Sequence, residues 1–113
     1  MHEVSLCRSL VRIMEDEAAR QGFRRVRTAY LDLGALSCVE SAALRFAFES
    51  CTRGTCADGA ELVIAVQPAR AWCWDCAGEI AVTAYGGDCP ACGGGKVQLL
   101  DGQEMRLREL EVQ

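Results

Sequence analysis

Residues 73–92 read CWDCAGEIAVTAYGGDCPAC and decide how the chain is organised, because they hold two Cys-x-x-Cys pairs. The pairs are Cys73 with Cys76 and Cys89 with Cys92. Two thiolates separated by two residues reach one ion through a tight turn, and two such turns complete a tetrahedral shell that suits zinc. Because sulfur would fill all four positions, the spacing predicts a structural zinc site with no open position for a substrate.

Other uses of the four cysteines are less consistent with the sequence. A pair of disulfides or a redox motif is one alternative, but a redox Cys-x-x-Cys ordinarily comes singly within a thioredoxin-like βαβ context. A nucleic-acid-binding zinc ribbon is another, but the only basic residue between positions 71 and 100 is Lys96. The same stretch carries Asp75, Glu79 and Asp88. An acidic module repels phosphate, so zinc in a structural role is the favoured interpretation.

The segment before the cysteines begins with a helical pattern and a strand pattern. From Val4 to Ala19 apolar residues recur at three- and four-residue steps, which predicts one buried helical face. Gly22 follows and can end the helix. The segment VRTAYLDLG, residues 26–34, then alternates apolar and polar side chains, which predicts a strand covered on one face.

A second helix and a second strand follow. Ser37 and Glu40 have the spacing of a capping box that would open a helix, and Gly54 can end it. In ELVIAVQ, residues 61–67, the side chains of Leu62, Ile64 and Val66 share one phase. Pro68 then ends this strand. A strand, a helix and a strand in succession predict a right-handed crossover that joins parallel strands.

The Cys-rich stretch is poor in apolar periodicity, and strand character returns only near the end. In EMRLRELEV, residues 104–112, the apolar phase shifts after Leu107, which suggests a bulge in a third strand of the first sheet. We therefore predict an α+β fold, a small α/β domain with two helices on a three-stranded mixed sheet and an inserted zinc-ribbon-like four-cysteine module. The expected domains are 1–69 with 103–113 for the α/β part and 70–102 for the zinc part.

Composition limits the class of protein. The net charge of −4 argues against a nucleic-acid surface, and no run approaches the ~18 apolar residues of a membrane span. The sequence shows no signal peptide, so a cytoplasmic location is expected, where thiols stay reduced. Four cysteines lie outside the two pairs: Cys7, Cys38, Cys51 and Cys56. The first and third fall on apolar helix faces and are expected to be inert, while the roles of Cys38 and Cys56 stay open.

The chain opens MHEVSLCRSLV, and His2 is its only histidine. A terminal amine, the His2 amide nitrogen and the His2 imidazole can surround one ion, with the Glu3 amide or carboxylate as a fourth ligand. Nitrogen-rich square-planar sites suit Ni(II) and Cu(II). Termini ordinarily fray, so on the residues alone both a solvated His2 and a metal site stay open.

Four stretches taken together resemble the hydrogenase-maturation nickel metallochaperone family. They are MHEVSLCRSLV, LGALSCVESAALRFAFE, GAELVIAVQPA and the CxxC…CPxC pair, and the likeness covers nearly the whole chain, including EMRLRELEV. The resemblance implies that His2 is the nickel ligand, with Glu3 contributing through its backbone or modulating binding. It also implies structural zinc at four cysteines: Cys73, Cys76, Cys89 and Cys92.

Partners and function follow from the same resemblance. Members of the family pass nickel to the [NiFe]-hydrogenase large subunit together with a nickel-binding GTPase, and some also serve urease through its accessory proteins. The residues supply no catalytic constellation, so a carrier rather than an enzyme is expected, with no nucleic-acid or membrane partner. Nickel would be cargo and zinc structural. The alternative is a zinc-ribbon protein-interaction module without a nickel role.

Overall fold

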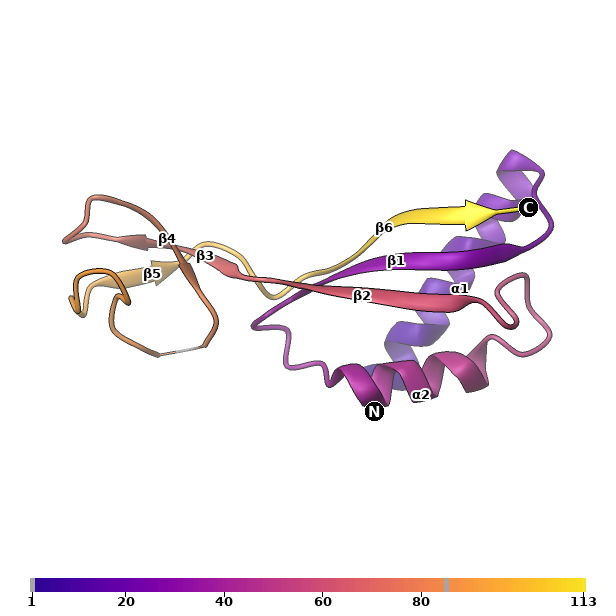
Figure 1. Cartoon of the computed structure of the whole chain (residues 1–113), viewed down its shortest axis with the longest axis horizontal. Coiled ribbons are helices and arrows are strands. Elements are labelled where there is room, and N and C mark those ends of the chain that lie inside the picture. The colour runs from indigo at the N-terminus through magenta and orange to yellow at the C-terminus, as the bar shows by residue number, and fades with distance from the viewer. Residues whose placement is uncertain (1, 85) are drawn as a thin grey trace. The chain divides into compact units, whose positions relative to one another are not determined.

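The computed structural model describes residues 2–84 and 86–113, and at His2 it describes the backbone alone. Two helices and six strands are described, in two three-stranded sheets ordered β2-β1-β6 and β4-β3-β5 (Figure 1). In chain order the elements are α1 (His2–Gln21), β1 (Val26–Gly34), α2 (Ser41–Cys51), β2 (Glu61–Gln67), β3 (Ala69–Cys73), β4 (Gly78–Val82), β5 (Val97–Leu99) and β6 (Met105–Val112). The predicted fold class is confirmed.

Helix α1 buries the face that its sequence period predicts. Cys7, Leu10 and Met14 lie on that face and are at most 2% exposed. The helix begins two residues before the predicted start at Val4 and ends where Gly22 was expected to end it. Gly22 adopts a φ of 79° and donates its N–H to the carbonyl of Ala18 at 2.9 Å, a left-handed helix end that glycine tolerates without strain.

Helix α2 begins at a different cap from the predicted one. Instead of a Ser37–Glu40 capping box, Glu40 is itself the N-cap, and its carboxylate accepts hydrogen bonds from the N–H groups of Ala42 at 3.2 Å and Ala43 at 2.7 Å. One carboxylate therefore satisfies two orphan donors and places negative charge at the positive end of the helix. The helix ends at Cys51 with Thr52 as its C-cap. This end lies three residues before Gly54, where the sequence predicted that the helix would stop.

Strand β1 is the central strand of the first sheet and matches the predicted segment 26–34. Its alternating residues Ala29, Leu31 and Leu33 are buried, as predicted. Strand β2 runs parallel to β1, as the crossover predicts, whereas β6 runs antiparallel to it (Figure 1). Reciprocal backbone bonds between Arg25 and Gln113 join the start of β1 to the end of β6, which agrees with that antiparallel direction.

The predicted single phase of β2 is only partly right. Leu62 is buried and Ile64 is half-buried, but Val66 is 58% exposed. Because β2 is an edge strand of its sheet, one flank lacks a neighbouring strand that could cover side chains near its end. In β6, residues Met105, Leu107 and Leu110 are half-buried, so its burial changes phase after Leu107; the bulge stays a prediction.

The chain divides into two compact units. The first comprises Met1–Leu31, Val39–Ala65 and Leu107–Gln113, and the second comprises Asp32–Cys38 and Val66–Arg106. Among the described residues of the Val66–Arg106 segment, the buried apolar side chains are only those of Ala69, Ala71, Cys73 and Cys89. Such small side chains form little hydrophobic core. A bound metal would therefore supply much of the folding free energy of this segment. The predicted domains are a nickel-binding part, 1–69 with 103–113, and a zinc-binding part, 70–102. This division stays a prediction.

Candidate metal centres

The structure brings the four predicted cysteines into one cluster. Cys73 ends β3, Cys76 lies in the turn before β4, and Cys89 and Cys92 lie in the loop between β4 and β5. Their Sγ atoms all lie within 4.8 Å of one another. The Cys73–Cys92 pair is separated by 3.6 Å and the Cys76–Cys89 pair by 3.7 Å. No other group of three or more metal-ligating side chains is this close in the described part of the chain.

These sulfur separations fit a tetrahedral zinc shell. A zinc–sulfur bond of about 2.3 Å makes the edge of the sulfur tetrahedron about 3.8 Å. A disulfide would instead require sulfurs about 2.05 Å apart, and all eight cysteines are free. The donor set and the spacing therefore fit a four-thiolate zinc site better than a pair of disulfides.

Backbone geometry holds the sulfurs in place. The N–H of Cys76 points to the Sγ of Cys73 at 3.4 Å, and the N–H of Gly94 points to the Sγ of Cys92 at 3.4 Å. Gly93 has a φ of 76° and donates its N–H to the carbonyl of Cys89 at 2.8 Å, which closes the second turn. Space is tight there, since a Cβ added to Gly94 would lie 2.1 Å from the Asp75 carboxylate.

The four thiols are not equivalent toward protons. Backbone N–H groups of Cys92 and Ala91 lower the pKa of Cys89 to about 7, because they stabilise the thiolate. Hydrogen bonds shared with Cys92, Cys73 and Cys89 raise the pKa of Cys76 to about 12. A zinc ion that binds all four side chains as thiolates therefore has to displace protons.

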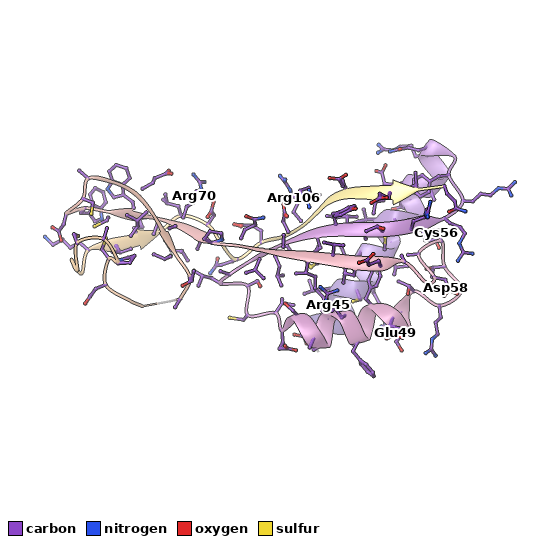
Figure 2. All side chains as sticks on the ribbon, in the orientation of Figure 1. Arg45, Glu49, Cys56, Asp58, Arg70 and Arg106 are labelled. Atoms are coloured by element: carbon purple, nitrogen blue, oxygen red, sulfur yellow. The ribbon has the colours of Figure 1, made fainter. Side chains whose placement is uncertain are left out.

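The arginine nearest in sequence to the cluster is already paired with carboxylates. Arg70, labelled in Figure 2, lies on β3, and its Nε lies 2.6 Å from Asp101 while its Nη1 lies 3.3 Å from Glu79. The guanidinium in turn lowers the pKa of Asp101, mainly through the hydrogen bond. A cation that is already paired with two carboxylates is poorly placed to bind phosphate, which agrees with the argument against a nucleic-acid surface.

The predicted nickel ligands lie in the other compact unit. Met1 and the side chain of His2 lie outside the described residues, while the His2 backbone begins α1. Glu3 is half-buried, and its Oε2 accepts a hydrogen bond from the backbone N–H of Glu40 at 3.3 Å. Sequence reasoning gave no signal for this contact, because the two residues are 37 positions apart.

The cysteines outside the cluster differ in accessibility. Cys7 is fully buried and donates its thiol to the carbonyl of Leu44 at 3.4 Å, and burial raises the pKa of that thiol to about 11. The expectation that Cys7 is a buried thiol is confirmed, whereas Cys51 is only half-buried. Cys38 is exposed with a φ of 61°, and Cys56 is half-buried with a pKa raised by burial and by Glu15.

Comparisons with known proteins show the family of this chain. Residues 1–112 match the family model described as "HypA: Hydrogenase/urease nickel incorporation, metallochaperone, hypA". The chain belongs to the HypA family. It is 42% identical over 113 residues to the hydrogenase maturation factor HybF of Salmonella typhimurium, and 43% identical over 113 residues to the hydrogenase maturation factor HypA of Acidithiobacillus ferrooxidans. Both alignments cover all of both chains.

Two solved HypA structures have the same fold as this chain. The solution structure of the Ni metallochaperone HypA from Helicobacter pylori matches with a TM-score of 0.69 and 26% identity, covering 97% of this chain and 96% of that one. A second HypA solution structure matches with a TM-score of 0.74 and 27% identity, covering 100% and 97%. The family resemblance seen in the sequence is thus confirmed, and the family is one of metallochaperones that serve hydrogenase maturation.

Neither described helix combines the length and hydropathy that crossing a membrane requires.

Proposed function

We propose that this chain carries Ni(II) for the maturation of [NiFe] hydrogenase. It would bind the ion at the Met1–His2–Glu3 terminus and deliver it together with a nickel-binding GTPase to the hydrogenase large subunit. The observation that carries the proposal is family membership over residues 1–112 combined with the Met-His-Glu start. Urease accessory proteins are a second class of partner, since the family model includes urease. A carrier of this kind is not an enzyme, and it would work in the cytoplasm.

The backbone at the start of α1 supports nickel binding there. The helix begins at His2, and the first four N–H groups of a helix have no acceptor within it. Amide nitrogens of His2 and Glu3 can therefore deprotonate and bind an ion without breaking helical hydrogen bonds. The negative charge that results lies at the positive end of the helix dipole, which stabilises it.

Glu3 is better placed to position this site than to bind the ion through its side chain. Its carboxylate already accepts the hydrogen bond from the Glu40 N–H, so the contact holds the first turn of α1 against the start of α2. We propose that Glu3 contributes its backbone nitrogen and fixes the terminus through its side chain. Nickel would then leave by ligand exchange when a partner offers competing ligands.

Zinc would have a structural role in this protein. We propose that Cys73, Cys76, Cys89 and Cys92 hold one Zn²⁺, whose binding free energy replaces the hydrophobic core that the small buried side chains around it do not provide. Four thiolates leave no open coordination position, so the ion would not handle nickel or a substrate.

Metal stoichiometry of tag-free protein tests this proposal. Wild-type protein is expected to bind both nickel and zinc, whereas His2→Ala is expected to lose nickel and keep zinc. Ser5→Ala, an exposed change on the first turns of α1, is the matched control and should bind nickel as wild type does. Unchanged nickel affinity in His2→Ala would contradict the proposal and would favour a zinc-ribbon interaction module without a nickel role.

A further inference from the structure

The exposed sides of α1 and α2 enclose a hollow that the metal sites leave unexplained. Its volume is about 640 Å³, which is the size of many binding pockets. From α2 it is lined by a stripe of four residues at helical spacing, Ala43, Phe46, Ala47 and Ser50, together with Cys51. From α1 it is lined by Glu3, Val4 and Arg8. We call it the α1–α2 groove. The stripe follows the axis of α2, so the groove is lengthened along a helix.

Phe46 makes this groove an unusual surface for a small protein. Its side chain is 77% exposed, the largest fraction among the large hydrophobic residues that the structure describes as exposed. Ala47 beside it is buried, and together they form an apolar floor and wall. Phe46 together with the other apolar residues of the groove forms a contiguous patch, and such patches mark interaction sites.

The charged residues that line the groove are Arg8 and Glu3, and a second arginine follows on α1, although the whole chain has a net charge of −4. Arg8 lines the groove and Arg12 lies one turn further along α1, outside the lining residues, and both are exposed. Within the residues that the structure describes, neither guanidinium has an ion-pair partner. The carboxylate of Glu3 is held at the backbone N–H of Glu40. An occupant with carboxylates is therefore complementary to the two arginines.

We infer that the α1–α2 groove binds an amphipathic helix of a partner protein. Apolar side chains of that helix pack on Phe46 and Ala47, and its carboxylates face Arg8 and Arg12. A helix that lies along a groove inserts apolar side chains at three- and four-residue steps. The residues of the α2 stripe have the same spacing. The docking needs no metal ion, although Glu3 of the proposed nickel site also lines the groove.

A second copy of this chain fits the groove less well. Its only acidic helical run is Glu15–Asp16–Glu17 on α1. Glu15 accepts a hydrogen bond from the backbone N–H of Cys56 at 3.1 Å, and Glu17 is paired with Arg20 and with Gln21. Two of these three carboxylates are therefore occupied within their own chain, so a partner of different sequence is the better source of negative charge.

Two synthetic helical peptides test the inference by fluorescence anisotropy. Both carry leucines along one face; one carries glutamates beside them and the other carries lysines. The glutamate peptide is expected to bind the full-length, metal-loaded protein, and Phe46→Ala is expected to weaken it at least about tenfold. Arg8→Glu should weaken the glutamate peptide and strengthen the lysine peptide. The matched controls, Val66→Ala and Arg53→Glu, change an exposed valine and an exposed arginine outside the groove and should bind as wild type does.

Cells that lack their own chaperone test the use of the groove. Phe46→Ala and Arg8→Glu are expected to lower hydrogenase activity several-fold while the purified variants keep wild-type nickel and zinc stoichiometry, which separates this inference from the nickel proposal. Equal binding of the two peptides, or full hydrogenase activity of Phe46→Ala, would overturn it. Self-association in analytical ultracentrifugation that Phe46→Ala abolishes would assign the groove to a second copy and overturn it as well.

Discussion

At the scale of single residues, two glutamates organise the start of both helices. Glu40 caps α2 with its side chain, while its backbone N–H donates a hydrogen bond to the carboxylate of Glu3 on α1. The two functions use different atoms of Glu40, so they can be separated by mutation. Replacing the side chain removes the cap but leaves the N–H that holds the terminus.

Glu40→Ala is therefore expected to destabilise the protein without weakening nickel binding. Loss of an N-cap costs about 1 kcal/mol, which corresponds to a Tm lower by about 4 °C in a domain of this size. The matched control is Glu49→Ala, which removes the same charge from an exposed position on α2 (Figure 2). Thermal unfolding followed by circular dichroism measures both variants. Equal Tm values for the two would contradict the capping role of Glu40.

At the scale of elements, the second unit contains close backbone approaches at glycines. Gly34 at the end of β1 and Gly102 ahead of β6 lie against each other, since a Cβ on Gly34 would be 2.2 Å from the carbonyl oxygen of Gly102. Hydrogen bonds of 2.8 Å from Gly34 to Glu104 and from Leu36 to Gly102 accompany this approach. Glycine is required here because no side chain fits.

Gly102→Ala is expected to lower the free energy of unfolding by about 2–4 kcal/mol. Its φ of 110° strains an alanine, and the added methyl would lie 2.2 Å from the Cβ of Ala69. Gly87→Ala is the matched control, because no described atom lies within 4 Å of its added Cβ and its φ is not positive. Its change should stay within about 0.5 kcal/mol. Urea denaturation of the zinc-loaded proteins compares them, and similar midpoints would contradict the packing argument.

A feature could be predicted from the sequence when its cause lies within one short segment of the chain. The grouping of Cys73, Cys76, Cys89 and Cys92 follows from spacing alone, and β1 follows from alternation within one segment. The cap of α2 was misassigned because Ser37 and Glu40 both suit a helix start, and only backbone conformation chooses between them. The exposure of Val66 depends on sheet order, and the Glu3–Glu40 bond joins residues 37 positions apart, so neither has a local signal.

At the scale of the whole molecule, stability comes from different sources in the two units. The first unit buries large apolar side chains, among them Leu10, Met14, Leu31 and Leu44. The second unit contains the four-cysteine cluster and, in its Val66–Arg106 segment, buries only alanine and cysteine among the described apolar residues. The helices therefore have a core that contains none of the predicted zinc ligands, so metal loss should affect the two units unequally.

Removal of zinc is expected to unfold the module around the cysteines and to leave the helices folded. Structural zinc in small modules contributes about 10–16 kcal/mol of apparent binding free energy, which is folding free energy when no large core exists. Both tryptophans, Trp72 and Trp74, lie in this module with ring centroids 6.0 Å apart, and the Trp72 Nε1 is buried. Their fluorescence should shift to the red after chelation, while the helical far-UV circular dichroism persists.

Two comparisons make that experiment decisive. Cys73→Ala should reproduce the spectrum of the chelated protein without any chelator, because it removes one thiolate of the cluster and leaves the others short of a complete shell. Cys38→Ser, a change at an exposed cysteine outside the cluster, should leave the fluorescence and its zinc dependence as in wild type. Zinc added back to the chelated wild type should restore the emission. A tryptophan signal indifferent to zinc, or helices that melt together with the module, would show that the metal is not the local source of stability argued above.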